Sequence, residues 1–465
     1  MKTRLPIAAP IAGCVLFAAL GTCRADNPVV QTLYTADPAP VVINDTLYLF
    51  TGHDEGGRFF TMHNWRCYST KDMVNWTDHG SPLACKDFAW ARDDAWAGQV
   101  IERNSKFYYF VPMNRKNGGM SIGVAVADKP EGPYKDAIGK PLIATGDGNI
   151  DPTQFIDDDG QAYLYWGNPA LKYVKLNEDM ISFDQKVGIV TVPLTVDGFG
   201  KREKDPKRAT LYEEGPWFYK RNGLYYMVYA ASGIPENICY ATSPNATGPW
   251  TFKGIIMPTE NSKATGHRTT SFTNHPGVIE YRGHNYFFYH DGALPGGGGY
   301  NRSVCIEEFK YNADGTFPTI PMTDVGPAPI ARLDPFQQQE AATICWETGV
   351  KTQPRADDKP GVFVTDIDDG DFIKVRNVDF GTGAASFAAT LAAPTDSGSI
   401  ELHLDSQTSD PVATLPVSAT GGWDTWKSQT TSLQGAQGVH DLYFVFRGKA
   451  GSHLFNFDSW KFEKK

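Results

Sequence analysis

Short apolar runs alternate with polar positions along most of this 465-residue chain, and turn residues separate the runs. Five segments repeat one order of features: a polar start, an apolar run, a tight turn and an aromatic run. The five segments are residues 37–50 (DPAPVVINDTLYLF), 96–111, 151–167, 214–230 and 275–290. Their first residues stand 59, 55, 63 and 61 positions apart. A repeat of about 60 residues with two strands in each unit is typical of propeller blades.

The turns inside the five repeats carry residues that favour tight hairpins. They are Asn44-Asp45, Asn104-Ser105, Asp159-Gly160, Asn222-Gly223 and Arg282-Gly283. Asn, Asp and Gly tolerate the positive φ angles that two-residue hairpin turns require. The pattern therefore predicts an all-β protein in which residues 27–330 form a five-bladed β-propeller.

The pattern changes after the last repeat. Residues 321–336 contain four prolines and are interpreted as a linker or a docked connector. Residues 338–465 lack the repeat and show short alternating strands such as 399–405 (SIELHLD). This pattern predicts a second domain over residues 338–465, a β-sandwich of the jelly-roll type.

The N-terminus has the features of a secretory signal peptide. Two basic residues precede an apolar stretch over residues 5–20, and small residues lead to Ala25. We expect residues 1–25 to be removed and the mature protein to be secreted or periplasmic. The alternatives are a buried first helix and a lipid anchor on Cys14 or Cys23. No later run of 18 apolar residues exists, so no later membrane span is predicted.

Charge and aromatic content restrict the expected partners. The chain has 43 Lys and Arg against 53 Asp and Glu, which gives a net charge of −10. An acidic balance without basic clusters argues against nucleic acid and anionic membranes as partners. Aromatic residues make up 13% of the chain, a content that suits a protein acting on carbohydrate.

Cysteine content gives a weaker signal. Five cysteines follow the predicted signal peptide, at positions 67, 85, 239, 305 and 345. Cys67 and Cys85 are candidates for a disulfide in an oxidising compartment, and the odd count leaves at least one thiol unpaired. No Cys-x-x-Cys spacing is present, which argues against a zinc site.

The first position of each repeat carries a side chain that suits chemistry. In a propeller the first strand of each blade lines the central channel, so equivalent positions of different blades converge. Those positions hold Asp37, Trp96, Asp151, Glu214 and His275. Glycoside hydrolysis needs one protonated and one ionised carboxyl group, and a third carboxylate raises the pKa of the acid. Each residue alone is compatible with a turn, surface or core role, but their shared register favours a catalytic pocket.

At these residues the chain resembles glycoside hydrolase family 43, and the resemblance covers residues 27–330. The resemblance implies an inverting five-bladed enzyme acting on arabinose- and xylose-containing polysaccharides. Asp37 in ADPAPVV matches the general base of that family, and Glu214 in EEGPWFYK matches its general acid. Asp151 in NIDPTQF matches its orienting, pKa-raising aspartate. His275 in TNHPGVI resembles an axial histidine linked to a metal ion or water, and Arg302 in NRSV resembles a pocket arginine.

The resemblance implies a single displacement in which Asp37 deprotonates water and Glu214 protonates the leaving oxygen. Trp96 and His275 are then expected to contact the substrate. The leading hypothesis is a monomeric α-L-arabinofuranosidase or arabinoxylan arabinofuranohydrolase acting on plant cell-wall polysaccharide or derived oligosaccharides. A β-xylosidase and an endo-arabinanase are the alternatives within the family. A non-catalytic glycan-binding lectin is the alternative from another class.

Residues 338–465 resemble carbohydrate-binding module family 6. The motifs are QQQEA (337–341), DIDDGDFIKV (366–375), GGWDTW (421–426) and FNFDSW (455–460). The resemblance implies a structural Ca²⁺ held by Glu340, Asp458 and Gln338, in keeping with the oxygen ligands of that ion. It also implies that Trp423 stacks on a sugar and that Asn456 hydrogen-bonds it.

One position departs from that second family. Asp366 stands where the family commonly places a tyrosine, the second wall of its sugar cleft. A two-sided aromatic clamp is therefore not expected in this form. Phe363 and Trp346 are the candidates to replace the missing ring.

Overall fold

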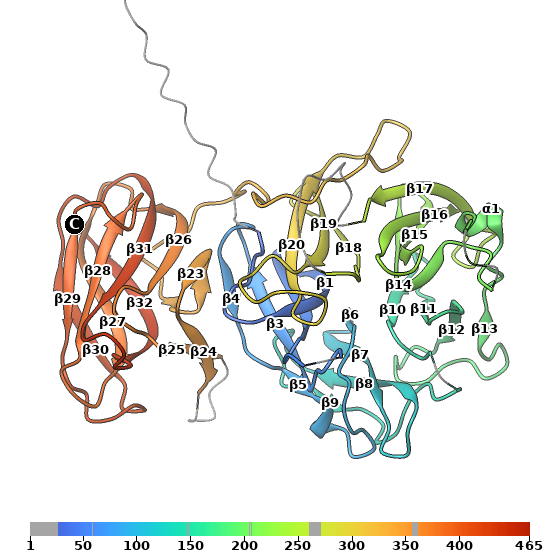
Figure 1. The fold of residues 1–465 in the computed structure, drawn as a ribbon, viewed down its shortest axis with the longest axis horizontal. Helices are drawn as coiled ribbons and strands as arrows, with labels where there is room; N and C mark the ends of the chain where they lie inside the picture. The colour runs from blue at the N-terminus through green and yellow to red at the C-terminus, as the bar shows by residue number, and fades with distance from the viewer. Residues whose placement is uncertain are drawn as a thin grey trace, which may run out of the picture.

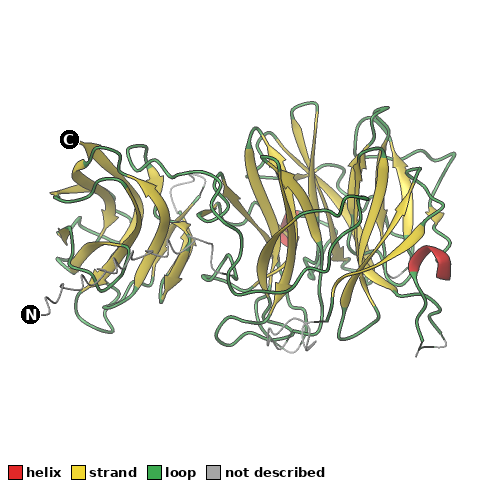
Figure 2. Cartoon of the chain, turned by 90° about the horizontal axis from the view of Figure 1, so that it is seen from above, coloured by secondary structure: helices red, strands yellow, loops and turns green. Residues whose placement is uncertain are grey.

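The computed structural model describes residues 27–57, 59–146, 148–203, 205, 207–259, 271–355 and 361–465. The predicted signal peptide, residues 1–25, lies outside the described residues. The described chain forms two all-β parts, a ring of five antiparallel sheets and a sandwich beside it (Figure 1). Figure 2 shows how strands account for nearly all regular structure. The predicted fold class, a β-propeller followed by a β-sandwich, is confirmed.

Each of the five sheets of the ring is built from consecutive strands, as expected for blades, and the first sheet has β22 (Thr343–Ile344) as an additional edge strand. The first sheet contains β1 (Thr35–Ile43), β2 (Thr46–His53), β3 (Asn64–Thr70), β4 (Trp76–Asp78) and β5 (Leu83–Ala84), followed by the 3₁₀ turn η1 (Cys85–Asp87). The second contains β6 (Gln99–Arg103), β7 (Lys106–Asn114), β8 (Met120–Ala127) and β9 (Lys135–Asp136). The third contains β10 (Thr153–Ile156), β11 (Ala162–Trp166), β12 (Lys172–Leu176) and β13 (Val190–Thr191), followed by α1 (Val196–Phe199). The fourth contains β14 (Tyr212–Arg221), β15 (Leu224–Ala231), β16 (Asn237–Ser243) and β17 (Thr251–Met257), and the fifth contains β18 (Gly277–Tyr281), β19 (His284–Asp291) and β20 (Ser303–Phe309).

Local turn chemistry and aromatic packing explain this arrangement. Both turn residues of the first hairpin have positive φ, 48° at Asn44 and 58° at Asp45, as a type I′ turn requires. The aromatic second strands then fill the space between blades. The rings of Phe50 in β2 and Tyr109 in β7 meet edge-on at 5.2 Å, which joins the first two blades. The aromatic repeats therefore form the inter-blade core.

The start of the described chain closes the ring. Asn27 Nδ2 donates to the backbone oxygen of Ile306 in β20 at 3.1 Å, and the Ile306 amide donates back to Asn27 Oδ1 at 3.0 Å. The Val29 amide donates to the Val304 oxygen at 2.9 Å. The segment before the first blade thus pairs with the last strand of the fifth, which covers an otherwise open edge.

The sandwich contains two antiparallel sheets packed face to face. One sheet contains β24 (Lys351–Pro354), β25 (Val362–Thr365), β32 (Asn456–Lys464), β27 (Ala384–Ala392) and β30 (Lys427–Ser432), with β21 (Gln339–Glu340) beside β32. The other contains β23 (Trp346–Thr348), β26 (Phe372–Asp379), β31 (Val439–Arg447), β28 (Gly398–Leu404) and β29 (Ala413–Val417). Inward-facing apolar side chains such as Phe387 and Phe444 form the core between them.

The sandwich is docked on the first blade rather than tethered to it. Strand β22 (Thr343–Ile344) pairs with β4 and so extends the first blade. Asn75 and Arg376 exchange two hydrogen bonds, one at 2.9 Å and one at 2.8 Å. Figure 1 shows β23 and β24 on the side of the sandwich that faces β4.

Two further predictions can be compared with the described chain. Cys67 and Cys85 are buried free thiols, so the disulfide considered for them is not formed. Cys67 lies in β3 and Cys85 in η1, and both pack as small apolar residues in the propeller core. Within the described part of the chain, no helix is long and apolar enough to cross a membrane.

Candidate active site

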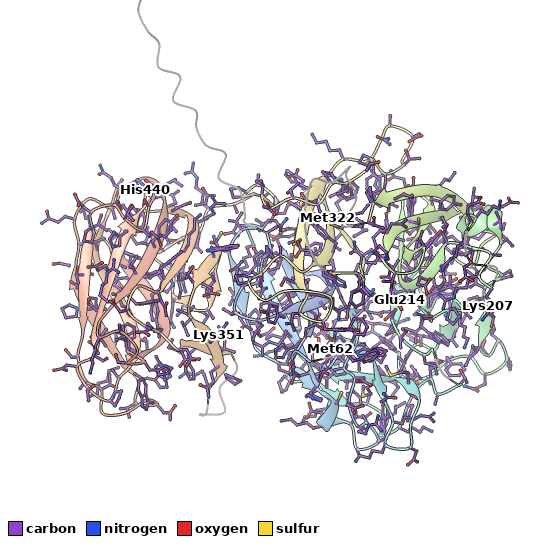
Figure 3. All side chains as sticks on the ribbon, viewed as in Figure 1. Met62, Lys207, Glu214, Met322, Lys351 and His440 are labelled. Carbon is purple, nitrogen blue, oxygen red and sulfur yellow. The ribbon has the colours of Figure 1, made fainter. Side chains whose placement is uncertain are left out.

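Six predicted residues meet in one pocket of 240 Å³. Asp37 lies in β1 and Glu214 in β14, three others lie before the first strand of their blade, and Arg302 lies just before β20. The six residues are Asp37, Trp96, Asp151, Glu214, His275 and Arg302. Figure 3 shows Glu214 and Met62, a second lining residue, in the interior of the propeller. Their catalytic and binding roles stay predictions.

The backbone is distorted where the carboxylates enter the pocket. Asp37 has a φ of 55° and Asp151 a φ of 57°, values that residues other than glycine rarely adopt. The pairing of β1 with β2 is irregular after Ala36, and that of β14 with β15 is irregular on both sides of Glu214. Such bulges re-aim a side chain out of the regular strand direction.

Glycine is required beside the predicted acid. Gly215 has a φ of 58°, and a Cβ atom built on it would lie 3.0 Å from His275 Nδ1. The His275 ring therefore packs directly against the backbone that carries Glu214.

Asp37 lies beside a permanent positive charge. Its Oδ1 is 3.3 Å from Arg302 Nη1 and 3.5 Å from His290 Nδ1. Burial raises the pKa of Asp37, but Arg302 together with His275 and His290 outweighs burial and leaves this pKa below its ordinary value. Burial is the main reason that the pKa of His275 and that of His290 are lowered. Asp37 is therefore ionised at neutral pH.

A buried aspartate holds Arg302 in place. Arg302 Nε donates to Asp54 Oδ2 at 2.9 Å and Nη2 donates to Asp54 Oδ1 at 3.0 Å. This two-point contact leaves Nη1 directed at Asp37 and at Thr273 Oγ1, each at 3.3 Å.

Glu214 and Asp151 form a coupled pair of carboxyl groups. Asn168 Nδ2 donates to Glu214 Oε2, and the Gly215 amide donates to Asp151 Oδ2 at 2.9 Å. Burial is the main reason that the pKa of each is raised, and the Glu214 carboxylate raises the pKa of Asp151 further. Because two close carboxylates resist being ionised together, the pair holds its proton to a higher pH than a free carboxyl group does.

Four contributors to the pocket's electrostatics were missed by the sequence reasoning: Asp54, Asn168, Glu236 and His290. Asp54, Asn168 and His290 lie at or just after the end of a second strand, β2, β11 or β19. In an antiparallel hairpin the second strand ends beside the start of the first. That offset is the signal that could have identified these three residues.

Glu236 does not line the pocket but contacts a residue that does. It is 4% exposed, and its Oε2 accepts the Asn274 amide at 2.8 Å, next to His275. Burial raises the pKa of Glu236 well above its ordinary value, and the Glu214 carboxylate adds to the rise. Glu236 thus positions the loop that carries His275.

Aromatic side chains form the rim of the pocket. Trp96 Nε1 donates to the Phe60 oxygen at 3.0 Å, and the Phe60 ring lies 4.9 Å from that of Tyr300. Phe59 is 55% exposed and lines the pocket mouth. Flat aromatic walls suit the apolar face of a sugar ring, and the carboxylates beside them suit its hydroxyl groups.

The sandwich has a pocket of its own, of 470 Å³, which Trp423 and Asn456 line together. Trp423 is 42% exposed, as a stacking ring requires. Asn456 Nδ2 donates to the Trp423 oxygen at 2.9 Å, so it fixes the loop that presents the ring. Asp366 and His453, 3.3 Å apart, line the same pocket and give it a polar wall. Phe363 also lines it, whereas Trp346 lies elsewhere.

The predicted calcium ligands lie beside a guanidinium group. Gln338 and Glu340 are exposed, while Asp458 is buried and contacts Arg355. The Arg355 guanidinium also lies 5.2 Å from the centre of the Trp426 ring. Because Arg355 already balances the charge of Asp458, these residues as placed do not fit a calcium ion, and the ion stays a prediction. Among the described residues, no group of three or more His, Cys, Asp or Glu side chains is arranged to hold a metal.

Comparison with known proteins identifies the family. The glycosyl hydrolases family 43 model matches residues 25–317, and the carbohydrate binding module (family 6) model matches residues 340–464. Arabinoxylan arabinofuranohydrolases of Bacillus subtilis (strain 168) and Paenibacillus polymyxa are each 32% identical over 94% of this chain, and over 92% and 74% of their own lengths. A crystal structure of a family 43 arabinoxylan arabinofuranohydrolase from Bacillus subtilis with cellotetraose has a TM-score of 0.82 at 31% identity, covering 96% of this chain and 99% of that one. The chain therefore belongs to glycosyl hydrolases family 43 and is a glycoside hydrolase with a C-terminal carbohydrate-binding module of family 6.

Proposed function

We propose that this enzyme removes α-L-arabinofuranosyl groups from arabinoxylan by inverting hydrolysis. The observation that carries the proposal is the opposite behaviour of two carboxyl groups in one pocket. Arg302 lowers the pKa of Asp37, whereas burial raises that of Glu214. A base and an acid are thereby available at the same pH. Two relatives that are 32% identical over 94% of this chain carry the name arabinoxylan arabinofuranohydrolase, which supports the choice of substrate.

The proposed reaction is a single displacement. The Asp37 carboxylate takes a proton from water as the water oxygen bonds to the anomeric carbon. The bond from that carbon to the leaving oxygen breaks, and Glu214 gives its proton to the leaving oxygen. Asp151 keeps the pair protonated before the reaction, and Arg302 holds Asp37 in position. The product sugar then has the opposite anomeric configuration.

The size of the pocket supports action on one terminal sugar. A volume of 240 Å³ suits a single pentose better than a polymer segment. The main chain of the polysaccharide would then remain outside. We further propose that the module binds polysaccharide through Trp423, and that the enzyme acts outside the cell, in line with the predicted signal peptide.

The acid role of Glu214 is tested with Glu214→Gln. We expect arabinose release from arabinoxylan to fall by roughly 10²–10⁴-fold, because the leaving oxygen loses its proton donor. The loss on a nitrophenyl arabinofuranoside should be smaller, because nitrophenolate leaves without protonation. Glu213→Gln is the matched control, since Glu213 pairs with Arg202 and Arg208 rather than lining the pocket.

The measurements are released arabinose and the melting temperature of each variant. Proton NMR of the first product distinguishes inversion from retention. Full activity of Glu214→Gln would remove Glu214 from the acid role. Hydrolysis of the nitrophenyl xyloside in preference to the arabinofuranoside would favour a β-xylosidase instead, and no hydrolysis of either would favour a lectin.

A further inference from the structure

A third hollow lies between the propeller and the module. This interdomain groove, of 550 Å³, is lined by Tyr34 and Pro295 from the propeller and by Trp346, Glu347 and Thr348 from β23. Lys351, another lining residue, lies near the boundary between the two parts in Figure 3. The groove is distinct from the module pocket that contains Trp423.

The groove shares a wall with the active-site pocket. Asp54 and Asn301 line the groove, and Asp54 holds the Arg302 side chain that lines the pocket. The shared wall consists of the loops that follow β2 and β19. Both strands end on the face of the propeller where Asp37 begins the first blade, so pocket and groove lie on the same face.

The lining of the groove suits a neutral sugar chain. The rings of Tyr34 and Trp346 are partly exposed, and Tyr34 Oη donates to the Pro295 oxygen at 2.7 Å, which fixes its ring. Glu347 is 7% exposed, and its Oε2 accepts the Val350 amide at 3.1 Å. A sugar ring has apolar faces and carries hydroxyl groups along its edges. Aromatic rings with a few buried polar groups nearby therefore suit a sugar ligand.

The charges of the groove argue against an anionic ligand. Glu55 and Glu347 are acidic, and the Lys351 ammonium donates to the Thr32 oxygen at 3.1 Å. Burial raises the pKa of Glu347 to about 7, so this carboxyl group is partly neutral near neutral pH and can both donate and accept hydrogen bonds.

We propose that the interdomain groove binds the polysaccharide main chain from which the pocket removes an arabinosyl group. This inference rests on the proposed function. The propeller and the docked module together would then form accessory subsites beside the pocket. Trp346 provides the stacking surface of these subsites, a role separate from that of Trp423.

The test compares a long and a short substrate. With Trp346→Ala, KM for arabinoxylan and for arabinoxylo-oligosaccharides should rise roughly three- to tenfold, the size of one lost aromatic contact. The kinetics on nitrophenyl arabinofuranoside, which fills only the pocket, should stay unchanged. Val439→Ala is the matched control, because Val439 is exposed on the module and lines neither the groove nor the Trp423 pocket, so KM for every substrate should stay unchanged.

A second variant guards against a folding effect. Thr348 is exposed, so Thr348→Arg should fold normally and obstruct the groove, with the same rise in KM. Unchanged KM for oligosaccharides in both variants would overturn the proposal, as would an equal loss on both substrate types. Failure of the proposed function is separate, because the wild-type enzyme would then release no arabinose from either substrate.

Discussion

Arg302 organises the charges around the predicted base. Asp54 binds the guanidinium through two nitrogen atoms, and the remaining nitrogen faces Asp37. A fixed fork of this kind keeps its direction when substrate enters. Arg302 also lowers the pKa of Glu214, but burial and the negative charge of Asp37 prevail there and the pKa rises. The surroundings of the two carboxyl groups thus shift their pKa values in opposite directions.

Replacing Asp151 tests the coupling between the carboxyl groups. Asp37 must be ionised and Glu214 protonated, so the rate rises with pH through the pKa of Asp37 and falls through that of Glu214. Asp151→Asn leaves Glu214 without this neighbouring carboxylate, so we expect the pKa of Glu214 to fall. The alkaline limb of kcat/KM should therefore move to lower pH, with kcat reduced roughly a hundredfold.

The measurement is the pH profile of kcat/KM for both proteins. Asp157→Asn is the control, because Asp157 lies in a hairpin turn where it pairs with Lys220. An alkaline limb that stays in place in Asp151→Asn would show that Asp151 does not influence the proton on Glu214.

The hairpin is the unit that builds the pocket. Its first strand brings a carboxylate to the channel, and the residue after its second strand returns to the same edge. Asp37 and Asp54 come from one such hairpin, and Asp151 and Asn168 from another. These two blades therefore each contribute a pair of side chains rather than one.

At the scale of strands, the contacts between Asn27 and β20 close the ring of blades and contribute to stability. Asn27 is 6% exposed and bonds the backbone of β20 through both its side-chain atoms. Asn27→Ala leaves the β20 groups without these partners, so we expect a loss of about 1–3 kcal/mol in the free energy of unfolding. The thermal midpoint should fall while activity at low temperature is retained.

Asn177→Ala is the matched control. The Asn177 side chain donates one exposed hydrogen bond, to the Ser182 hydroxyl, and holds no distant strand. Equal midpoints for the two variants would contradict a closing role for Asn27.

At the scale of the whole molecule, the two domains are joined by direct contacts. Strand β22 extends the first blade, and Thr352 Oγ1 donates to Asp78 Oδ2 at 2.8 Å across the interface. Docking places the interdomain groove next to the pocket and leaves the Trp423 pocket on the module itself. The active-site pocket, the interdomain groove and the Trp423 pocket are thus carried by one docked pair of domains.

Arg355 tests how the module is stabilised. Its guanidinium and the Asp458 carboxylate are both about nine-tenths buried. Arg355→Met should lower the free energy of unfolding by roughly 3–5 kcal/mol, because it leaves a buried carboxylate unpaired. Calcium should then raise the thermal midpoint of the variant, whereas chelator or calcium should leave the wild type unchanged.

The measurement is the thermal midpoint with calcium and with chelator. Loss of wild-type stability in chelator would contradict this account and support the calcium ion predicted at Glu340, Asp458 and Gln338.

The fold and the predicted catalytic set could be anticipated because both follow local rules. Turn pairs such as Asn44-Asp45 specify hairpins without distant contacts, and the regular spacing of the repeats places Asp37, Asp151 and Glu214 at one channel. The partners Asp54 and His290 escaped notice because the sequence reasoning followed only the first strand of each hairpin, whereas both residues lie at the end of a second strand. Phe363 and Trp346 were equal candidates for one cleft, and packing separated them into two sites.

Local sequence was thus enough to specify the all-β class, the blades and the meeting of three carboxylates, because periodicity and turn chemistry act over a few residues. Three-dimensional packing was needed for the rest: the protonation of each carboxyl group, the closure of the ring through Asn27, the pairing of Arg355 with Asp458, and the groove beside the pocket. These features depend on burial and on contacts between residues far apart in the chain. A local sequence pattern contains neither burial nor distant contacts, because both arise only when the chain has folded.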